Sequence, residues 1–190
     1  IDDAHGVSIC GKTGEGFVRS QYGNELGERT IIAASLGKGF GASGGMLMLG
    51  TARQEELFRR FAVAHAFSAS LNVAAIGAVS GSLTIHRSDE LLRRQLALNS
   101  NIELLDSMLV TEQSGAPLPI RTMNLGTEER AVNGTRALLD RGIYGSAIFF
   151  PTVAKGKAGI RVCVTSDHTS EEITALCAAL SEIMDDQTLS

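Results

Sequence analysis

Short strand-like runs alternate with amphipathic helix-like runs through the last part of the chain, and this alternation limits the fold more than any other feature. The expected elements are a strand at 120–125, a helix at 128–142, strands at 144–153 and 158–166, and a helix at about 170–184. Thr169, with Glu172 three residues later, forms a capping-box pattern before the last helix. Strands that alternate with helices of this length are typical of layered α/β domains, so we expect an α/β fold.

The first part of the chain is rich in glycine and loops but carries two further strand-like runs. The elements expected there are a buried strand at Thr30–Ser35, a second buried strand at Met46–Gly50, a helix at 52–64 and a helical region at about 73–109. Ser88 has the residue type and position of an N-cap inside the helical region. "SGAPLP", Ser114–Pro119, is the clearest boundary along the chain.

Charge and cysteine content exclude several classes of function. The net charge of −4 argues against non-specific binding to nucleic acid or to an anionic membrane. No run of about 18 apolar residues occurs, so we expect no membrane-spanning helix. Cys10, Cys163 and Cys177 are odd in number and widely spaced, which favours buried free thiols in a reducing compartment, the cytoplasm, over a disulfide framework or a metal site.

The chain opens on "IDDAHG", with neither Met nor a leader pattern. Asp2 and Asp3 resemble the end of a strand whose beginning is missing. We therefore expect the chain to be the C-terminal part of a longer protein.

One motif matches a known pattern in the wrong context. "GVSICGKT", Gly6–Thr13, fits the phosphate-loop pattern G-x-x-x-x-G-K-S/T letter for letter. That loop needs a buried strand before it and a helix directly after it, because the helix N-terminus helps to hold the phosphates. Here Gly14 and Gly16 oppose a helix start, so we interpret Lys12 as a solvated loop lysine.

Lys38 is the lysine with the most unusual setting among the four in the chain. It stands between two glycines directly after a strand-like run, whereas the others lie in polar loop stretches. A desolvated lysine at a strand end has a pKa that shifts easily, as amine nucleophiles require. The alternative is a lysine that reaches out to solvent from the strand end.

Three separate signals fit one kind of chemistry. "DDAH" places two carboxylates beside a histidine, "SLGKG" places a hydroxyl three residues before Lys38, and Arg161 lies in an otherwise apolar strand. A carboxylate, an imine-forming lysine and a carboxylate-binding arginine are the groups that a pyridoxal phosphate (PLP) enzyme acting on an amino acid requires. Each signal alone also has a structural explanation, such as a turn at "DDAH" or a buried ion pair at Arg161.

At these residues the chain resembles the α-oxoamine synthases, PLP enzymes of the aspartate aminotransferase fold that include 8-amino-7-oxononanoate synthase and 2-amino-3-ketobutyrate CoA ligase. "IDDAHGVSICGKTGEG" is similar to the family's D-(D/E)-(A/S)-H motif with its spaced glycines, and "SLGKGFGASGG" is similar to its lysine motif. "AFSAS" and "GKAGIRVCVTSDHT" are similar to two later family segments. The resemblance covers nearly the whole chain and implies the C-terminal half of a fold-type I PLP-dependent transferase. The implied parts are residues 1–72 of the PLP-binding large domain, a connecting helical region at 73–113 and a small α/β domain at 114–190.

The resemblance also implies roles for individual residues. Lys38 would hold the cofactor as an imine and later remove the α-proton of the amino acid. Asp2 would pair with the pyridine nitrogen, and His5 would bond the ring's phenolic oxygen. Ser35 would contact the phosphate. The other implied site residues are Phe67 and Ser68, toward the phosphate of a neighbouring subunit in a homodimer, and Arg161, toward the substrate carboxylate.

The implied reaction joins an amino acid to an acyl thioester, on CoA or acyl carrier protein, with loss of CO₂. The sequence departs from the family pattern at Gly159, where a second arginine is common, and at "YGSAIFF", which leans toward synthases of bacterial ketone signals. An aminotransferase or lyase of the same fold, and an inactive fragment that lacks the N-terminal half of the cofactor pocket, stay open as alternatives.

Overall fold

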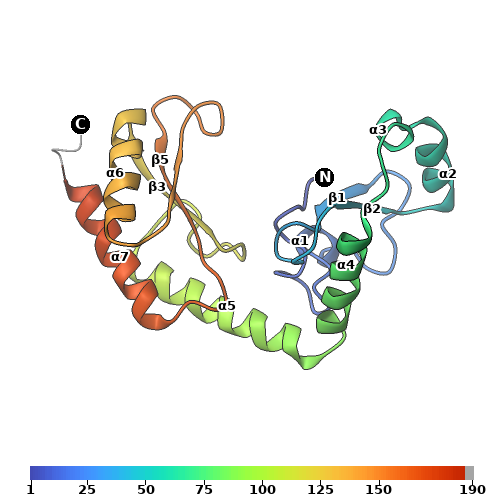
Figure 1. The fold of residues 1–190 in the computed structure, drawn as a ribbon, viewed down its shortest axis with the longest axis horizontal. Helices are drawn as coiled ribbons and strands as arrows, with labels where there is room; N and C mark the ends of the chain where they lie inside the picture. The colour runs from blue at the N-terminus through green and yellow to red at the C-terminus, as the bar shows by residue number, and fades with distance from the viewer. Residues whose placement is uncertain (187–190) are drawn as a thin grey trace. The chain divides into compact units, whose positions relative to one another are not determined.

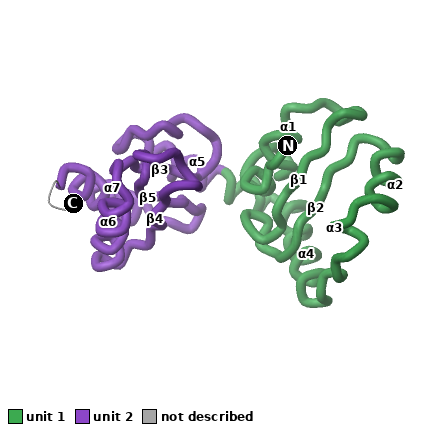
Figure 2. Tube along the Cα trace, turned by 90° about the horizontal axis from the view of Figure 1, so that it is seen from above, with its two compact units in different colours: residues 1–95 green, residues 96–190 purple. Residues whose placement is uncertain are grey.

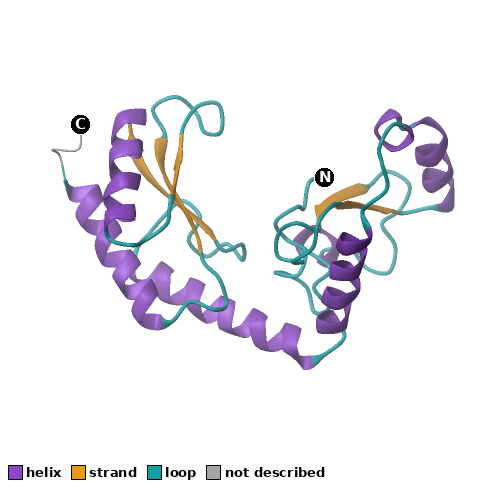
Figure 3. Ribbon diagram, in the orientation of Figure 1, coloured by secondary structure: helices purple, strands orange, loops and turns teal. Residues whose placement is uncertain are grey.

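The structure, a computed structural model, describes residues 1–186 and divides into two compact units, residues 1–95 and residues 96–190 (Figure 2). Each unit combines helices with a small sheet (Figure 3), which confirms the expected α/β class. The division falls within helix α5, Asp89–Met108. Because compactness does not assign roles, the functional division at 72/73 and 113/114 stays a prediction.

The first unit is built on an antiparallel hairpin of β1, Ile31–Ser35, and β2, Gly45–Leu49. The start of the chain runs parallel to β1: Asp3 N–H donates to the Ala33 carbonyl over 2.8 Å, and Ala33 N–H donates to the Ile1 carbonyl over 2.9 Å. Asp2 forms an isolated parallel bridge with Ala33. Both expected strands are present, and the opening residues pair beside β1. The expected burial of the second strand is wrong, because every residue of β2 is exposed or only half-buried.

Strand β1 is buried on one face only. Ile32 and Ala34 are buried, whereas Ile31 and Ala33 are exposed, as the two-residue period of a strand requires when one face of its sheet is open. The expectation of a buried strand at Thr30–Ser35 therefore holds for one face of β1 and is wrong for the other. The buried face packs in an apolar cluster of Val7, Ala34, Leu36 and Phe40.

This unit contains four helices that end before α5. They are α1 (Phe17–Ser20), α2 (Ala52–Phe61), α3 (Val63–Ala66) and α4 (Val73–His86). Three of them follow the expected regions with shifted ends, whereas the short α1 lies in a stretch that was expected to be loop. The expected helix over 52–64 breaks at Ala62, and the helical region over 73–109 breaks between α4 and α5. Ser88 accepts the Glu90 N–H over 3.3 Å at the start of α5, which confirms it as an N-cap.

The second unit is a three-stranded antiparallel sheet with helices packed on it (Figure 1). The elements are β3 (Ile120–Gly126), α6 (Glu128–Asp140), β4 (Ser146–Ile148), β5 (Ala158–Cys163) and α7 (Ser170–Asp185), with strand order β3-β5-β4. Helix α6 packs on the sheet and contacts all three strands. The core combines side chains of strands and helices, such as Ile160, Leu138 and Leu180.

Two expectations about this unit are corrected and one is confirmed. The strand expected over 144–153 is only three residues long, because the chain turns at Phe149, whose carbonyl accepts the Thr152 N–H. Cys163 is exposed at the last position of β5, although buried thiols were expected; only Cys177 is fully buried. The capping box of Thr169 and Glu172 is present as predicted.

Within residues 1–186, none of the helices combines the length and the apolar content that crossing a membrane requires.

Candidate functional site

Asp2 and Ser35 line one hollow of about 620 Å³ in the first unit. The hollow lies where the opening residues run beside β1, so the parallel pairing is what brings the two side chains together. Asp2 is exposed, and its Oδ1 accepts the Ala4 N–H over 2.8 Å. Small residues, among them Ala4, Gly44 and Gly45, form much of the remaining wall.

Asp3, the second acidic residue of the opening segment, has a structural role. Asp3 is 5% exposed, and its Oδ2 accepts the Val18 N–H over 2.9 Å. A Cβ at Gly6 would lie 2.1 Å from Asp3 Oδ1, so the loop closes tightly on this carboxylate. Asp3 therefore ties the opening loop together, whereas Asp2 and the half-buried His5 remain the candidates for chemistry.

Lys38 lies in the loop that joins β1 to β2. The loop is held by Leu36 N–H to the Gly44 carbonyl at 3.0 Å and by Gly41 N–H to the Lys38 carbonyl at 2.8 Å. Lys38 is exposed in this chain, so the expected desolvation of its amine is wrong here. The physical reason is local, because the flanking Gly37 and Gly39 have no side chains to cover it.

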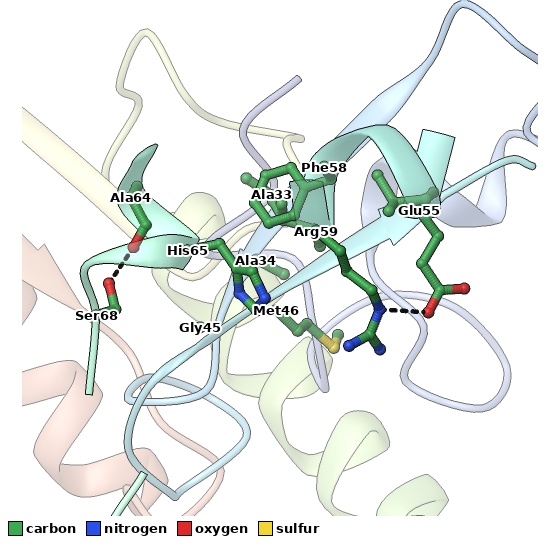
Figure 4. A pocket seen from close by; sticks show the side chains of 12 residues that line it. Ala33, Ala34, Gly45, Met46, Glu55, Phe58, Arg59, Ala64, His65 and Ser68 are labelled. Carbon is green, nitrogen blue, oxygen red and sulfur yellow. Dashed lines mark hydrogen bonds and ion pairs between the residues drawn. The ribbon is translucent and has the colours of Figure 1, made fainter. Parts of the chain in front are cut away.

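A second hollow of about 710 Å³ lies between the hairpin and helices α2 and α3 (Figure 4). Ser68 lines it, and its hydroxyl donates to the Ala64 carbonyl. Arg59 also lines it and is held by Glu55 at 2.9 Å. Phe67 lines neither hollow and is 88% exposed. The structure thus places Ser68 and Asp2 at different hollows, both of which include Ala33 and Ala34 in their walls.

Arg161 belongs to the second unit, in β5, opposite Thr122 of β3 and Ser146 of β4. Cross-strand partners point to the same face of a sheet, so these three polar side chains form one row. Among the described residues, Arg161 Nε is one of two buried side-chain polar atoms without a hydrogen-bond partner. A buried guanidinium N–H that lacks a partner is costly, and a bound anion would satisfy it.

Arg121 is a second strand arginine, and its environment is the opposite. It is 1% exposed, and it donates from Nε and Nη2 to the two oxygens of Asp106 over 2.6 and 2.8 Å. Its remaining donors meet backbone carbonyls, including that of Leu118 at 2.7 Å. This hydrogen bonding from Arg121 holds the pKa of Asp106 below its usual value. The sequence pattern makes both arginines look alike, but their partners separate a structural residue from a candidate ligand.

The segment that resembles a phosphate loop lacks the required geometry. Thr13 donates from its backbone N–H and from its hydroxyl to Glu15 Oε2, over 2.8 and 2.9 Å. The next helix, α1, begins only at Phe17 and is four residues long. Lys12 is exposed, in agreement with its interpretation as a solvated loop lysine.

Residues 1–180 match the family described as aminotransferase class I and II. The chain belongs to this family. One relative is the 8-amino-7-oxononanoate synthase of Aliivibrio fischeri, which is 32% identical to this chain over 189 residues. The aligned region covers 96% of this chain and 46% of that enzyme. The resemblance to the α-oxoamine synthases is thereby confirmed.

Solved structures show the same fold. The 8-amino-7-oxononanoate synthase of Francisella tularensis is 25% identical, with a TM-score of 0.72 over 95% of this chain and 53% of that one. A serine palmitoyltransferase, SPT with PLP internal aldimine, is 22% identical, with a TM-score of 0.81 over 96% and 46%. This aminotransferase class I and II chain spans about half the length of the curated relatives it matches.

Proposed function

We propose that this chain is the C-terminal half of a PLP-dependent acyltransferase that joins an amino acid to an acyl thioester with loss of CO₂. The observation that carries the proposal is the hollow shared by Asp2 and Ser35, three residues before Lys38, in a chain whose relatives are 8-amino-7-oxononanoate synthases. Free cysteines suit a reducing compartment, so we infer a cytoplasmic enzyme.

The residues present fit PLP. The hollow offers a carboxylate, Asp2, and a hydroxyl, Ser35, in a wall made largely of small residues. Lys38 does not line the hollow, but it follows Ser35 by three residues and is exposed, so its amine is accessible to an incoming aldehyde. When bound, PLP supplies an electron sink for the carbanion formed at the amino acid's α-carbon. In this proposal the Lys38 amine would hold the cofactor and, once released from it, would take up the α-proton.

Asp2 and His5 act on the ring in this proposal. A carboxylate beside the pyridine nitrogen keeps that nitrogen protonated, because an opposite charge favours the charged form. His5 would donate to the ring's phenolic oxygen. Asp2 is exposed, and only its Oδ1 accepts the Ala4 N–H, so its carboxylate is accessible to a ring.

We expect Asp2→Asn to lower turnover far more than cofactor content. The loss of a charged partner costs a few kcal/mol, which corresponds to about a hundredfold or more in rate. The phosphate contacts, which are untouched, supply much of the binding. Turnover and bound PLP should be measured together, with Glu28→Gln, an exposed loop substitution in the same unit, as the control. Turnover within about twofold of wild type would show that Asp2 is not the partner of the pyridine nitrogen.

Ser35 and the Phe67–Ser68 segment are assigned to the phosphate. Ser35 would bind it within the same chain. Phe67 and Ser68 would reach the phosphate of a neighbouring copy, so we propose a homodimer with shared sites. The high exposure of Phe67 agrees with such an inter-subunit position.

Arg161 is assigned to the substrate carboxylate, because its buried Nε lacks a partner. We expect Arg161→Lys to raise the amino acid KM by roughly tenfold or more, because lysine cannot make the two-pronged contact. The acyl thioester KM and the cofactor spectrum should change little. A purely structural arginine predicts a lower melting temperature with an unchanged amino acid KM, and that result would overturn the assignment.

The reaction itself is tested by supplying the native protein with amino acids and acyl thioesters on CoA and on acyl carrier protein. The proposal predicts CO₂ release that requires both substrates and yields an α-amino ketone. Amino-group transfer to an oxoacid without CO₂ release would instead show an aminotransferase. An α-amino ketone that functions as a signal would place the protein in the signal-forming branch.

A further inference from the structure

The segments that carry the candidate cofactor residues meet in one apolar cluster. The segment with Asp2 and His5 continues to Val7, and the loop with Lys38 continues to Phe40. Val7 and Phe40 are both buried in the same cluster. The contacts that hold this cluster together therefore also fix the position of the Asp2–His5 segment relative to the Lys38 loop.

His86, the last residue of α4, contacts both segments. Its Nε2 lies 2.9 Å from Ser8 Oγ, and its ring lies against Phe40 with a centroid distance of 4.8 Å. One turn earlier on α4, the hydroxyl of Ser82 donates to the Phe40 carbonyl over 2.5 Å. Helix α4 therefore contacts both the loop after Lys38 and the segment after His5, through the side chains of Ser82 and His86.

The Ser82 carbonyl orients the imidazole. It lies 2.8 Å from His86 Nδ1, and a carbonyl can only accept, so Nδ1 carries the proton. With the Nδ1 proton directed at this carbonyl, Nε2 can accept a hydrogen bond from the Ser8 hydroxyl. The ring also lies close to Gly14, where a Cβ would be 2.9 Å from His86 Cδ2. Together these contacts hold the His86 imidazole in a single orientation.

Ser8 is held in an unfavourable backbone conformation. Its φ of 71° is the only positive φ at a non-glycine position among the described residues. Its N–H donates to the Gly14 carbonyl over 2.8 Å, and Gln95 Nε2 donates to its carbonyl over 3.0 Å. Such conformations persist where surrounding contacts impose them, and they concentrate at functional sites.

We propose that His86 is a positioning residue that fixes the Asp2–His5 segment against the Lys38 loop, so that groups on both segments engage one cofactor. The inference rests on the proposed function. Asp2 and His5 would contact the ring of PLP, and Lys38 would bond to its aldehyde carbon. All three must therefore reach different atoms of one small, rigid molecule. A displacement of about 1 Å between the two segments is enough to weaken such a constellation strongly.

Two variants of the native protein separate positioning from stability. His86→Phe keeps an aromatic ring against Phe40 but loses both hydrogen bonds. Ser8→Gly removes the hydroxyl partner and tolerates the positive φ, so it spares the fold. The matched control is His168→Phe, in the second unit, where His168 Nδ1 accepts the Thr165 N–H over 3.1 Å.

After removal of the cofactor, each protein is titrated with PLP, and the Kd, the visible absorbance and the melting temperature are recorded. We expect His86→Phe to raise the Kd at least about tenfold and Ser8→Gly about threefold or more. Ser8→Gly should keep the wild-type melting temperature, and His168→Phe should keep the wild-type Kd.

The inference is overturned if Ser8→Gly and every folded His86→Phe sample keep a Kd within about twofold of wild type, whatever their melting temperatures. It is also overturned if His168→Phe weakens PLP equally, because the effect would then be general destabilisation. A wild-type protein without a visible lysine-bound band is a different result. It refutes the proposed function, and the inference falls with it.

Discussion

Lys38→Ala is expected to abolish both the visible absorbance of the lysine-bound cofactor and the turnover of the native protein. The amine of Lys38 has two tasks in the proposed function, to anchor PLP and to move the α-proton. Positioned proton transfer alone contributes about a hundredfold to ten-thousandfold in rate. We therefore expect turnover to fall by at least roughly a thousandfold, measured under saturating PLP and both substrates. Because Lys38 is exposed, the fold should be unaffected.

Lys12→Ala is the matched control. Lys12 is also an exposed loop lysine next to a glycine in the same unit, but it lies in the segment that only resembles a phosphate loop. It should keep full absorbance and turnover. If Lys12→Ala lost activity while Lys38→Ala retained it, the assignment of the imine lysine would be wrong.

Asp106→Ala is expected to cause the largest loss of stability in the second unit. The substitution leaves the guanidinium of Arg121, 1% exposed, without the carboxylate that takes two of its hydrogen bonds. Removal of one partner of a buried ion pair costs about 3–5 kcal/mol. Denaturant unfolding of the native protein measures this loss, and a change below about 1 kcal/mol would contradict the structural role of the pair.

The same pair predicts a pH dependence. The pKa of Asp106 is lowered in the folded protein, chiefly by hydrogen bonding from Arg121. A depressed carboxyl pKa contributes stability above the unfolded value, about 3.9, and this stability is lost as pH falls through the folded value. Wild type should therefore lose stability on acidification below about pH 4 more steeply than Asp106→Ala.

Glu90→Gln provides the surface comparison. Hydrogen bonds from Arg93 and Arg94 lower the pKa of Glu90 to about 2, but the three side chains lie at the surface of α5, where water reaches all of them. Solvent screening and side-chain entropy cancel most of such a pair's gain. We expect Glu90→Gln to unfold close to wild type, in contrast to Asp106→Ala.

Local signals predicted several features of the fold correctly. The capping pattern at Thr169 and the N-cap at Ser88 depend on hydrogen bonds between neighbours along the chain, and both are present. The hairpin strands at Ile31–Ser35 and Gly45–Leu49 follow their β-branched and apolar content. Such features need no knowledge of distant segments.

Other features depend on long-range contacts and escaped prediction. The exposure of Ala33 and Lys38 depends on what covers one face of the hairpin, which its own residues do not encode. Arg121 and Arg161 share a strand context, and only the placement of Asp106 distinguishes them. His86 gave no local signal, because its partner Ser8 lies 78 residues away.

The central claim, that Lys38 binds PLP through its amine, is tested most directly by borohydride reduction of the native holoprotein followed by peptide mapping. Reduction converts the imine to a stable amine and so marks the lysine that held the cofactor. The account predicts the label on the peptide that contains Lys38 and on no other lysine of this chain. Label on Lys12, Lys155 or Lys157, or a holoprotein that reduction leaves unlabelled, would contradict it.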